Sequence, residues 1–190
     1  MTTKLIPFTD SAYHFPLLIK NLLNTPLIYS PDREIIYRDI SRYDYKTFGT
    51  RVKKLAAMLK SQGVKPGDTV AVMDWDSHRY LECFFAIPMM GAVLHTINVR
   101  LTSEQLIYTI NHAQDDLILV NEDFVPLLSS IKDRVETIKK VILLSDKGES
   151  AWSVFDFAGE YEALMSQASP EYDFPDFDEN TMATTFYTTG

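Results

Sequence analysis

A turn followed by a strand is predicted by the stretch Lys65-Pro66-Gly67-Asp68-Thr69-Val70-Ala71-Val72-Met73. Proline followed by glycine fits the two central positions of a type II turn, of which the second needs a positive φ. The run that follows is apolar and has no polar alternation, which is typical of a strand that is buried on both faces. We therefore predict that residues 69–73 form a strand of a sheet that is covered by helices on both sides.

Three further apolar runs follow, and the four runs start about 24 residues apart, which is the room that a strand and a crossover helix need. They are residues 92–97, 116–120 and 140–144. The segments between them predict helices over 78–90, from the capping box Thr102-Ser103-Glu104-Gln105, and over 123–131. This alternation predicts an α/β fold with a doubly wound, mostly parallel sheet and crossover helices.

The rest of the chain has a simpler organisation. A short helix with Pro16 in its first turn, a hairpin from 33–38 and 42–45, and an amphipathic helix over 48–59 precede the first apolar run. The predicted division is a lead-in (1–15), an α/β N-terminal subdomain (16–168), an acidic linker (169–181), and a strand with the start of a loop (182–190).

Composition narrows the class of protein. The net charge of −8 argues against nucleic acid or an anionic membrane as a partner, because both need clustered basic residues. The one cysteine, Cys83, excludes an intrachain disulfide and sits in an apolar run that predicts burial. No apolar run is long enough to span a bilayer and the N-terminus has no signal-peptide core, so we predict a cytoplasmic protein.

Known motifs for other chemistries are absent from this sequence. It has neither the Gly-x-Gly-x-x-Gly of dinucleotide sites nor the Gly-x-Ser-x-Gly of common hydrolases. Its four histidines lack metal-ligand spacing, and His95, inside a predicted strand, fits a hydrogen-bonded core histidine. We predict no metal site and no catalytic residue in this chain.

The last eight residues are Ala183-Thr184-Thr185-Phe186-Tyr187-Thr188-Thr189-Gly190. A strand that ends in hydroxyl residues and glycine can present hydroxyl and backbone N–H donors to a phosphate. Thr188, Thr189 and Gly190 are therefore the candidate phosphate-binding residues. The plain alternative is a strand that enters a turn.

Several of these runs together resemble adenylate-forming (AMP-binding) enzymes of the acyl-CoA synthetase and luciferase superfamily. Residues 63–72 (GVKPGDTVAV) resemble the entry strand of that family, and residues 91–102 (GAVLHTINVRLT) resemble a later segment. Residues 187–190 (YTTG) resemble the start of its phosphate-binding motif. Residues 32–38 and 78–82 are most similar to medium- and long-chain fatty-acid–CoA ligases.

The resemblance implies a two-step reaction. A fatty carboxylate reacts with ATP, assisted by Mg²⁺, to give an acyl-adenylate and pyrophosphate, and coenzyme A then displaces AMP. Thr188, Thr189 and Gly190 would steady the β- and γ-phosphates. The resemblance also implies that the chain is a truncated N-terminal part of the enzyme, about its first third. We expect this part alone to be inactive, and it could cover its open sheet edge as a homodimer.

Two alternatives remain open on the sequence. The acid could instead be an aryl acid, acetate or an amino acid, because the acid pocket in this superfamily is formed largely by later sequence. The chain could also be a non-catalytic α/β module that binds a nucleotide or a partner protein.

Overall fold

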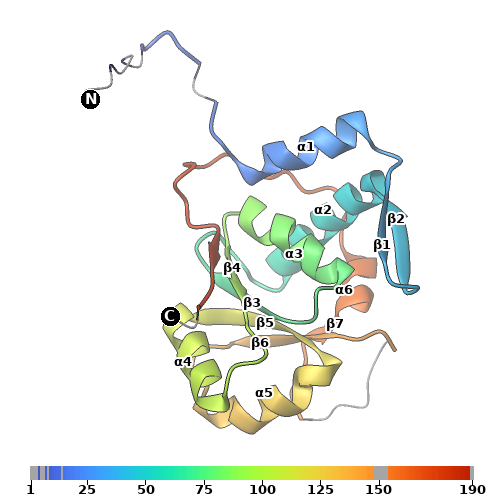
Figure 1. The fold of residues 1–190 in the computed structure, drawn as a ribbon, viewed down its shortest axis with the longest axis vertical. Coiled ribbons are helices and arrows are strands. Elements are labelled where there is room, and N and C mark those ends of the chain that lie inside the picture. The colour runs from blue at the N-terminus through green and yellow to red at the C-terminus, as the bar shows by residue number, and fades with distance from the viewer. Residues whose placement is uncertain (1–3, 5–6, 8, 14, 148–153, 189–190) are drawn as a thin grey trace.

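The computed structural model describes residues 4, 7, 9–13, 15–147 and 154–188, and its centre is a six-stranded sheet (Figure 1). The strand order is β7-β6-β5-β3-β4-β8, and every neighbouring pair is parallel. The strands are β3 (Thr69–Met73), β4 (Val93–Thr96), β5 (Asp115–Asn121), β6 (Lys140–Leu144), β7 (Gly159–Glu160) and β8 (Thr184–Thr185). The predicted parallel sheet is confirmed, and β3 lies near its middle.

Helices cover both faces of the sheet, which confirms the doubly wound α/β class. One face packs against α2 (Tyr45–Ser61), α3 (His78–Met89) and α6 (Tyr161–Gln167), and the other against α4 (Ser103–Ala113) and α5 (Val125–Ile131). Figure 1 shows α1 (Ile19–Tyr29) beyond α2 and α3. The remaining elements are the hairpin β1 (Glu34–Tyr37) and β2 (Ser41–Asp44) and the 3₁₀ turns Glu122–Phe124 and Lys132–Arg134.

Alternation along β3 divides its side chains between the two cores. Val70 and Val72 pack among the helices of one face, while Ala71 and Met73 pack among those of the other. All five residues of β3 are buried, as expected for a strand between two helical layers. Burial on both faces is why this strand is apolar throughout.

Local signals in the sequence give the expected turns and caps. Gly67 has a φ of +90°, and the Asp68 N–H donates to the Lys65 carbonyl at 3.1 Å, as a type II turn requires. The Ser77 hydroxyl caps α3, and Thr102 and Gln105 form the predicted capping box of α4. The predicted turn and the predicted capping box are confirmed.

The first helix differs from its prediction. The helix that was predicted to carry Pro16 in its first turn is α1 (Ile19–Tyr29), and Pro16 precedes it. The helix continues through Pro26 because Leu23 and Leu27, one turn apart, both pack against the core. Tertiary packing here outweighs the cost of a proline inside a helix.

The two ends of the sheet were also predicted incompletely. The strand β7 was not predicted, since two residues are too short for a periodic signal. The strand expected over 183–187 pairs only at Thr184 and Thr185. The segment 169–181 contains no helix or strand, but Tyr172 and Phe174 pack partly buried against the core.

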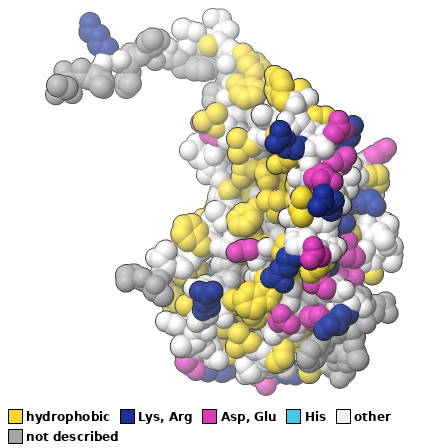
Figure 2. All heavy atoms as spheres, turned by 45° about the vertical axis from the view of Figure 1, so that its right-hand side comes forward, with side chains coloured by type: hydrophobic (Ala, Val, Ile, Leu, Met, Phe, Trp, Pro, Cys, Tyr) yellow, Lys and Arg dark blue, Asp and Glu magenta, His cyan; other side chains and the backbone are white. Residues whose placement is uncertain are grey.

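Burial along α3 does not follow the apolar residues of the helix. Leu81 and Phe84 are 36% and 45% exposed, whereas the charged Glu82 is fully buried. Figure 2 shows hydrophobic side chains gathered in a band down one face of the molecule. Beside the hairpin, Ile36, Leu81 and Phe84 line a hollow of about 290 Å³.

A hydrogen-bond network explains the burial of Glu82. Its carboxylate accepts hydrogen bonds from the Tyr43 hydroxyl at 2.8 Å, the Tyr161 hydroxyl at 2.6 Å and the Arg51 Nε at 2.6 Å. Arg51 in turn donates to Glu162 on α6 at 2.8 Å. A buried charge is tolerated when it is paired and hydrogen-bonded in this way. The network ties the hairpin, α2, α3 and α6 together.

Among the residues that the structure describes, no helix is long and apolar enough to cross a membrane.

The Glu82 network predicts a large loss of stability from a small change. Glu82→Gln keeps the shape but removes the charge that Arg51 faces, and breaking a buried pair costs about 3–5 kcal/mol. Urea unfolding should show that loss. The control is Glu34→Gln, which breaks the exposed ion pair with Arg42 and should cost less than about 1 kcal/mol. Equal losses in the two variants would contradict this account.

Candidate functional site

The candidate phosphate-binding residues follow β8 at one edge of the sheet. Because β8 runs parallel to β4, with Leu94 opposite Thr184 and His95 opposite Thr185, the chain leaves it at the carboxyl ends of the strands. Thr188 lies three residues beyond the last pair and is exposed. Thr189 and Gly190 lie outside the described residues. Ligands of open α/β sheets bind outside the carboxyl ends of the strands.

A hollow of about 410 Å³ lies at the ends of β3, β4 and β8. Residues that directly follow these three strands form most of its lining. Its lining residues are Asp74, Trp75, Asp76, Tyr80, Thr96, Ile97, Asn98, Val99, Arg100, Phe186 and Tyr187. Arg100 brings a positive charge to it, and Tyr187 immediately precedes Thr188. The hollow therefore adjoins the candidate phosphate-binding segment.

The neighbouring crevice, between β3 and β5, is filled by the protein's own side chains. This is the switch point of the sheet, because α3 leaves β3 on one face and α5 follows β5 on the other. The Asn121 amide donates to the buried Asp74 carboxylate at 2.7 Å, and the Ser77 hydroxyl donates to the same group. The Trp75 indole donates to Asp123 at 2.9 Å across the same edge.

Burial raises the pKa of the Asp74 carboxyl above its usual range, although the hydrogen bonds from Ser77 and Asn121 favour its charged form. A group that is held by two partners and taken from water suits a structural role at the crevice. The open space for a ligand therefore lies one strand further along, over β3, β4 and β8.

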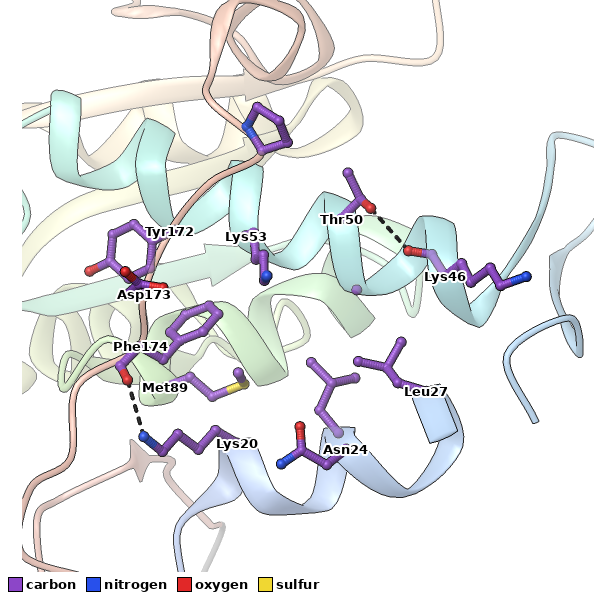
Figure 3. A pocket seen from close by; sticks show the side chains of 13 residues that line it. Lys20, Asn24, Leu27, Lys46, Thr50, Lys53, Met89, Tyr172, Asp173 and Phe174 are labelled. Atoms are coloured by element: carbon purple, nitrogen blue, oxygen red, sulfur yellow. Dashed lines mark hydrogen bonds between the residues drawn. The ribbon is translucent and has the colours of Figure 1, made fainter. Parts of the chain in front are cut away.

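A larger groove lies elsewhere, between α1, α2 and residues 170–174 (Figure 3). Its volume is about 570 Å³, and Leu23, Leu27 and Met89 are among its apolar lining residues. Two of its lysines are ion-paired to aspartates: Lys20 to Asp176 at 2.6 Å and Lys46 to Asp32 at 2.7 Å. None of the residues that the sequence singled out for phosphate binding lies in this groove.

Metal ligands are not clustered in the part of the chain that the structure describes: no group of three or more His, Cys, Asp or Glu side chains there could hold an ion. Mg²⁺ commonly binds through substrate phosphates with one or two carboxylates. Any Mg²⁺ that accompanies a nucleotide would be held in large part by that nucleotide.

Sequence reasoning singled out one segment next to this hollow and left out another. It selected the segment that begins at Thr188, from its hydroxyl and glycine pattern. It did not select Asn98 and Arg100, because nothing in the sequence places them beside Phe186 and Tyr187. Their position directly after a predicted strand was the available signal.

The predicted core histidine is confirmed. His95 is 1% exposed, and its Nδ1 lies 2.7 Å from a carboxylate oxygen of the fully buried Asp115. Cys83 is also buried, as predicted.

Comparisons with known proteins find relatives along most of the chain. The profile of a family described as AMP-binding enzyme matches residues 29–190. A 3-methylmercaptopropionyl-CoA ligase of Ruegeria lacuscaerulensis is 31% identical over 179 residues, which are 92% of this chain and 33% of that protein. A medium-chain-fatty-acid–CoA ligase of Ectopseudomonas oleovorans is 33% identical over 178 residues, with the same two coverages. The chain thus spans about a third of the length of the curated relatives it matches.

Solved structures share the fold. The crystal structure of an anthranilate CoA ligase in complex with anthranoyl-AMP matches 96% of this chain with a TM-score of 0.84 at 17% identity. The match covers 34% of that structure.

The crevice at the switch point predicts different roles for two neighbouring aspartates. Asp74→Ala leaves the Asn121 amide and the Ser77 hydroxyl without their acceptor, so unfolding in urea should show a loss of about 2 kcal/mol. Asp76→Ala, in the same loop but exposed, is the matched control and should change stability by less than about 0.5 kcal/mol. An Asp74→Ala variant with the stability of the wild type would refute the structural role.

Proposed function

Because the chain belongs to the AMP-binding enzyme family, we propose that it is part of an ATP-dependent acid–thiol ligase, an acyl-CoA synthetase. Its parallel sheet with helices on both faces matches the N-terminal domain of adenylate-forming enzymes. The observation that carries the proposal is the course of β8, which delivers Thr188 to the strand ends beside the hollow. This segment lies within the 29–190 match.

The proposed reaction has two steps. A carboxylate oxygen of the acid attacks the α-phosphorus of ATP, and the bond from that phosphorus to the bridging oxygen of pyrophosphate breaks. The sulfur of coenzyme A then attacks the acyl carbon, and AMP leaves with the electron pair of the acyl–oxygen bond. ATP and coenzyme A are therefore substrates of the proposed enzyme.

Thr188, Thr189 and Gly190 take the phosphate-binding role in this proposal. The Thr188 hydroxyl would donate to the β- and γ-phosphates, where negative charge grows as pyrophosphate departs. The guanidinium of Arg100, which lines the adjoining hollow, would add a charge-assisted contact. Mg²⁺ would enter with ATP as part of the substrate complex.

A medium- or long-chain fatty acid is the carboxylate that we propose. The support is the name of one relative, a medium-chain-fatty-acid–CoA ligase, together with the resemblance of residues 32–38 and 78–82 to such ligases. The name of the other relative, a 3-methylmercaptopropionyl-CoA ligase, favours a short acyl group instead.

The proposal has three further parts. The catalytic residues lie outside these 190 residues, the protein forms a homodimer, and its location is cytoplasmic.

The test uses the complete product of the gene that encodes this chain, in an ATP–pyrophosphate exchange assay. We expect exchange with medium- and long-chain fatty acids and less with acetate, an aryl acid and amino acids. Thr188→Ala should lower kcat/KM for ATP about 10²-fold, because it removes one donor to the developing charge. Thr181→Ala, in the exposed segment before β8, is the matched control and should leave kcat/KM unchanged.

Two results would count against the proposal. Exchange with other carboxylates and none with fatty acids would contradict the proposed fatty-acid substrate but would support the proposed ligase activity. Nucleotide binding without exchange for any acid would favour the alternative of a non-catalytic module.

A further inference from the structure

The strand that leads to Thr188 is weakly held by its own backbone. It pairs with β4 only at Thr184 and Thr185, and the Thr184 hydroxyl donates to the Leu94 carbonyl at 2.8 Å. Residues 186–188 continue past the last pair, with no strand hydrogen bonds to fix them. A segment that must present a hydroxyl to a phosphate needs another constraint, because positioning errors are costly in catalysis.

Tyr187 supplies a side-chain anchor in this segment. Its hydroxyl is hydrogen-bonded to Nδ1 of His112 on α4 at 2.8 Å. Its ring packs edge-on against His95, with 5.4 Å between the centroids, and against Tyr108 at 6.3 Å. Tyr108 and His112 stack on each other at 5.3 Å. The contacts come from both β4 and α4, so they fix the ring on more than one side.

His95 is itself held in place by a buried carboxylate on β5. Both oxygens of Asp115 lie within 2.9 Å of the His95 Nδ1, and neither side chain is more than 1% exposed. Burial raises the pKa of the Asp115 carboxyl, while the bond to His95 favours its charged form. Because β3 lies between β4 and β5, this contact joins the two strands on either side of β3, where His95 is opposite Ala71 and Asp115 is opposite Thr69.

We propose that His95, Tyr108, His112 and Asp115 form a clamp on Tyr187 that positions Thr188 for the nucleotide phosphates. These four are positioning residues, since none of them lines the hollow, whereas Tyr187 both lines it and is held by the clamp. The inference rests on the proposed function for its ligand. It rests on geometry alone for the statement that the clamp fixes residues 186–188.

Stability alone does not account for the clamp. A buried polar pair such as His95 and Asp115 adds little net stability over apolar residues of the same size. The hydrogen bond between Tyr187 and His112 lies at the exposed end of α4. What the arrangement does supply is a defined direction for the strand end that enters the hollow.

The first experiment measures steady-state kinetics of the complete gene product. Tyr187→Phe removes the hydroxyl and keeps the ring, and His112→Leu removes its partner at an exposed position. Each should raise the KM for ATP about 5-fold, the worth of one hydrogen bond, with the KM for the acid unchanged. The double variant should be no worse than either single one, since both break the same bond. Tyr29→Phe, far away at the end of α1, is the matched control.

The second experiment needs no activity. Hydrogen–deuterium exchange at the backbone amides of 184–188, without nucleotide, should be faster in Tyr187→Phe than in the wild type and unchanged in Tyr29→Phe. Unchanged amide exchange in Tyr187→Phe, or additive KM effects of the two single variants, would overturn the clamp. An inactive wild type would instead contradict the proposed ligase function. The exchange rates of the backbone amides would still decide whether the clamp holds the strand end.

Discussion

Burial of β3 on both faces is the constraint on which the rest of this structure depends. Its side chains alternate between two helical cores, and the strands on either side of it are parallel to it and joined by crossovers. Parallel strands all end at one edge of the sheet. That geometry brings Asp74 after β3, Arg100 after β4 and Thr188 after β8 to the same side of the molecule, although they are far apart in the sequence.

At the carboxyl ends of the strands, the protein's own side chains fill one space and leave the neighbouring space open to a ligand. At the switch point, where a ligand would be expected, Asp74 is hydrogen-bonded to Asn121 and Ser77, and Trp75 reaches Asp123. The neighbouring hollow over β3, β4 and β8 stays open. Beneath it, the clamp on Tyr187 fixes the segment that a pair of backbone contacts would leave loosely held. The same sheet therefore provides both the candidate site and the support for the segment that leads to it.

Short-range physics could be predicted from the sequence, and long-range contacts could not. The turn at Gly67, the capping box at Thr102 and the buried strands depend on neighbouring residues, and all were predicted. The extent of α1 was wrong because Leu27 packs against a distant core. The burial of Glu82 was missed because its partners Arg51, Tyr43 and Tyr161 come from three other elements.

The candidate site divides in the same way. The hydroxyl and glycine pattern selected Thr188, and the resemblance of neighbouring runs named the family. The hydrogen bond from Tyr187 to His112 spans 75 residues, and no local pattern marks it. Side chains that act through tertiary contacts, such as His95 and Asp115, carry only the signal of a core residue in the sequence.

A crystal structure of the complete gene product with ATP would test the central claim most directly. The account predicts that the triphosphate lies over the ends of β3, β4 and β8, within hydrogen-bond distance of Thr188, with the bond between Asp74 and Asn121 intact. A triphosphate in the crevice between β3 and β5, or in the groove between α1 and α2, would contradict it.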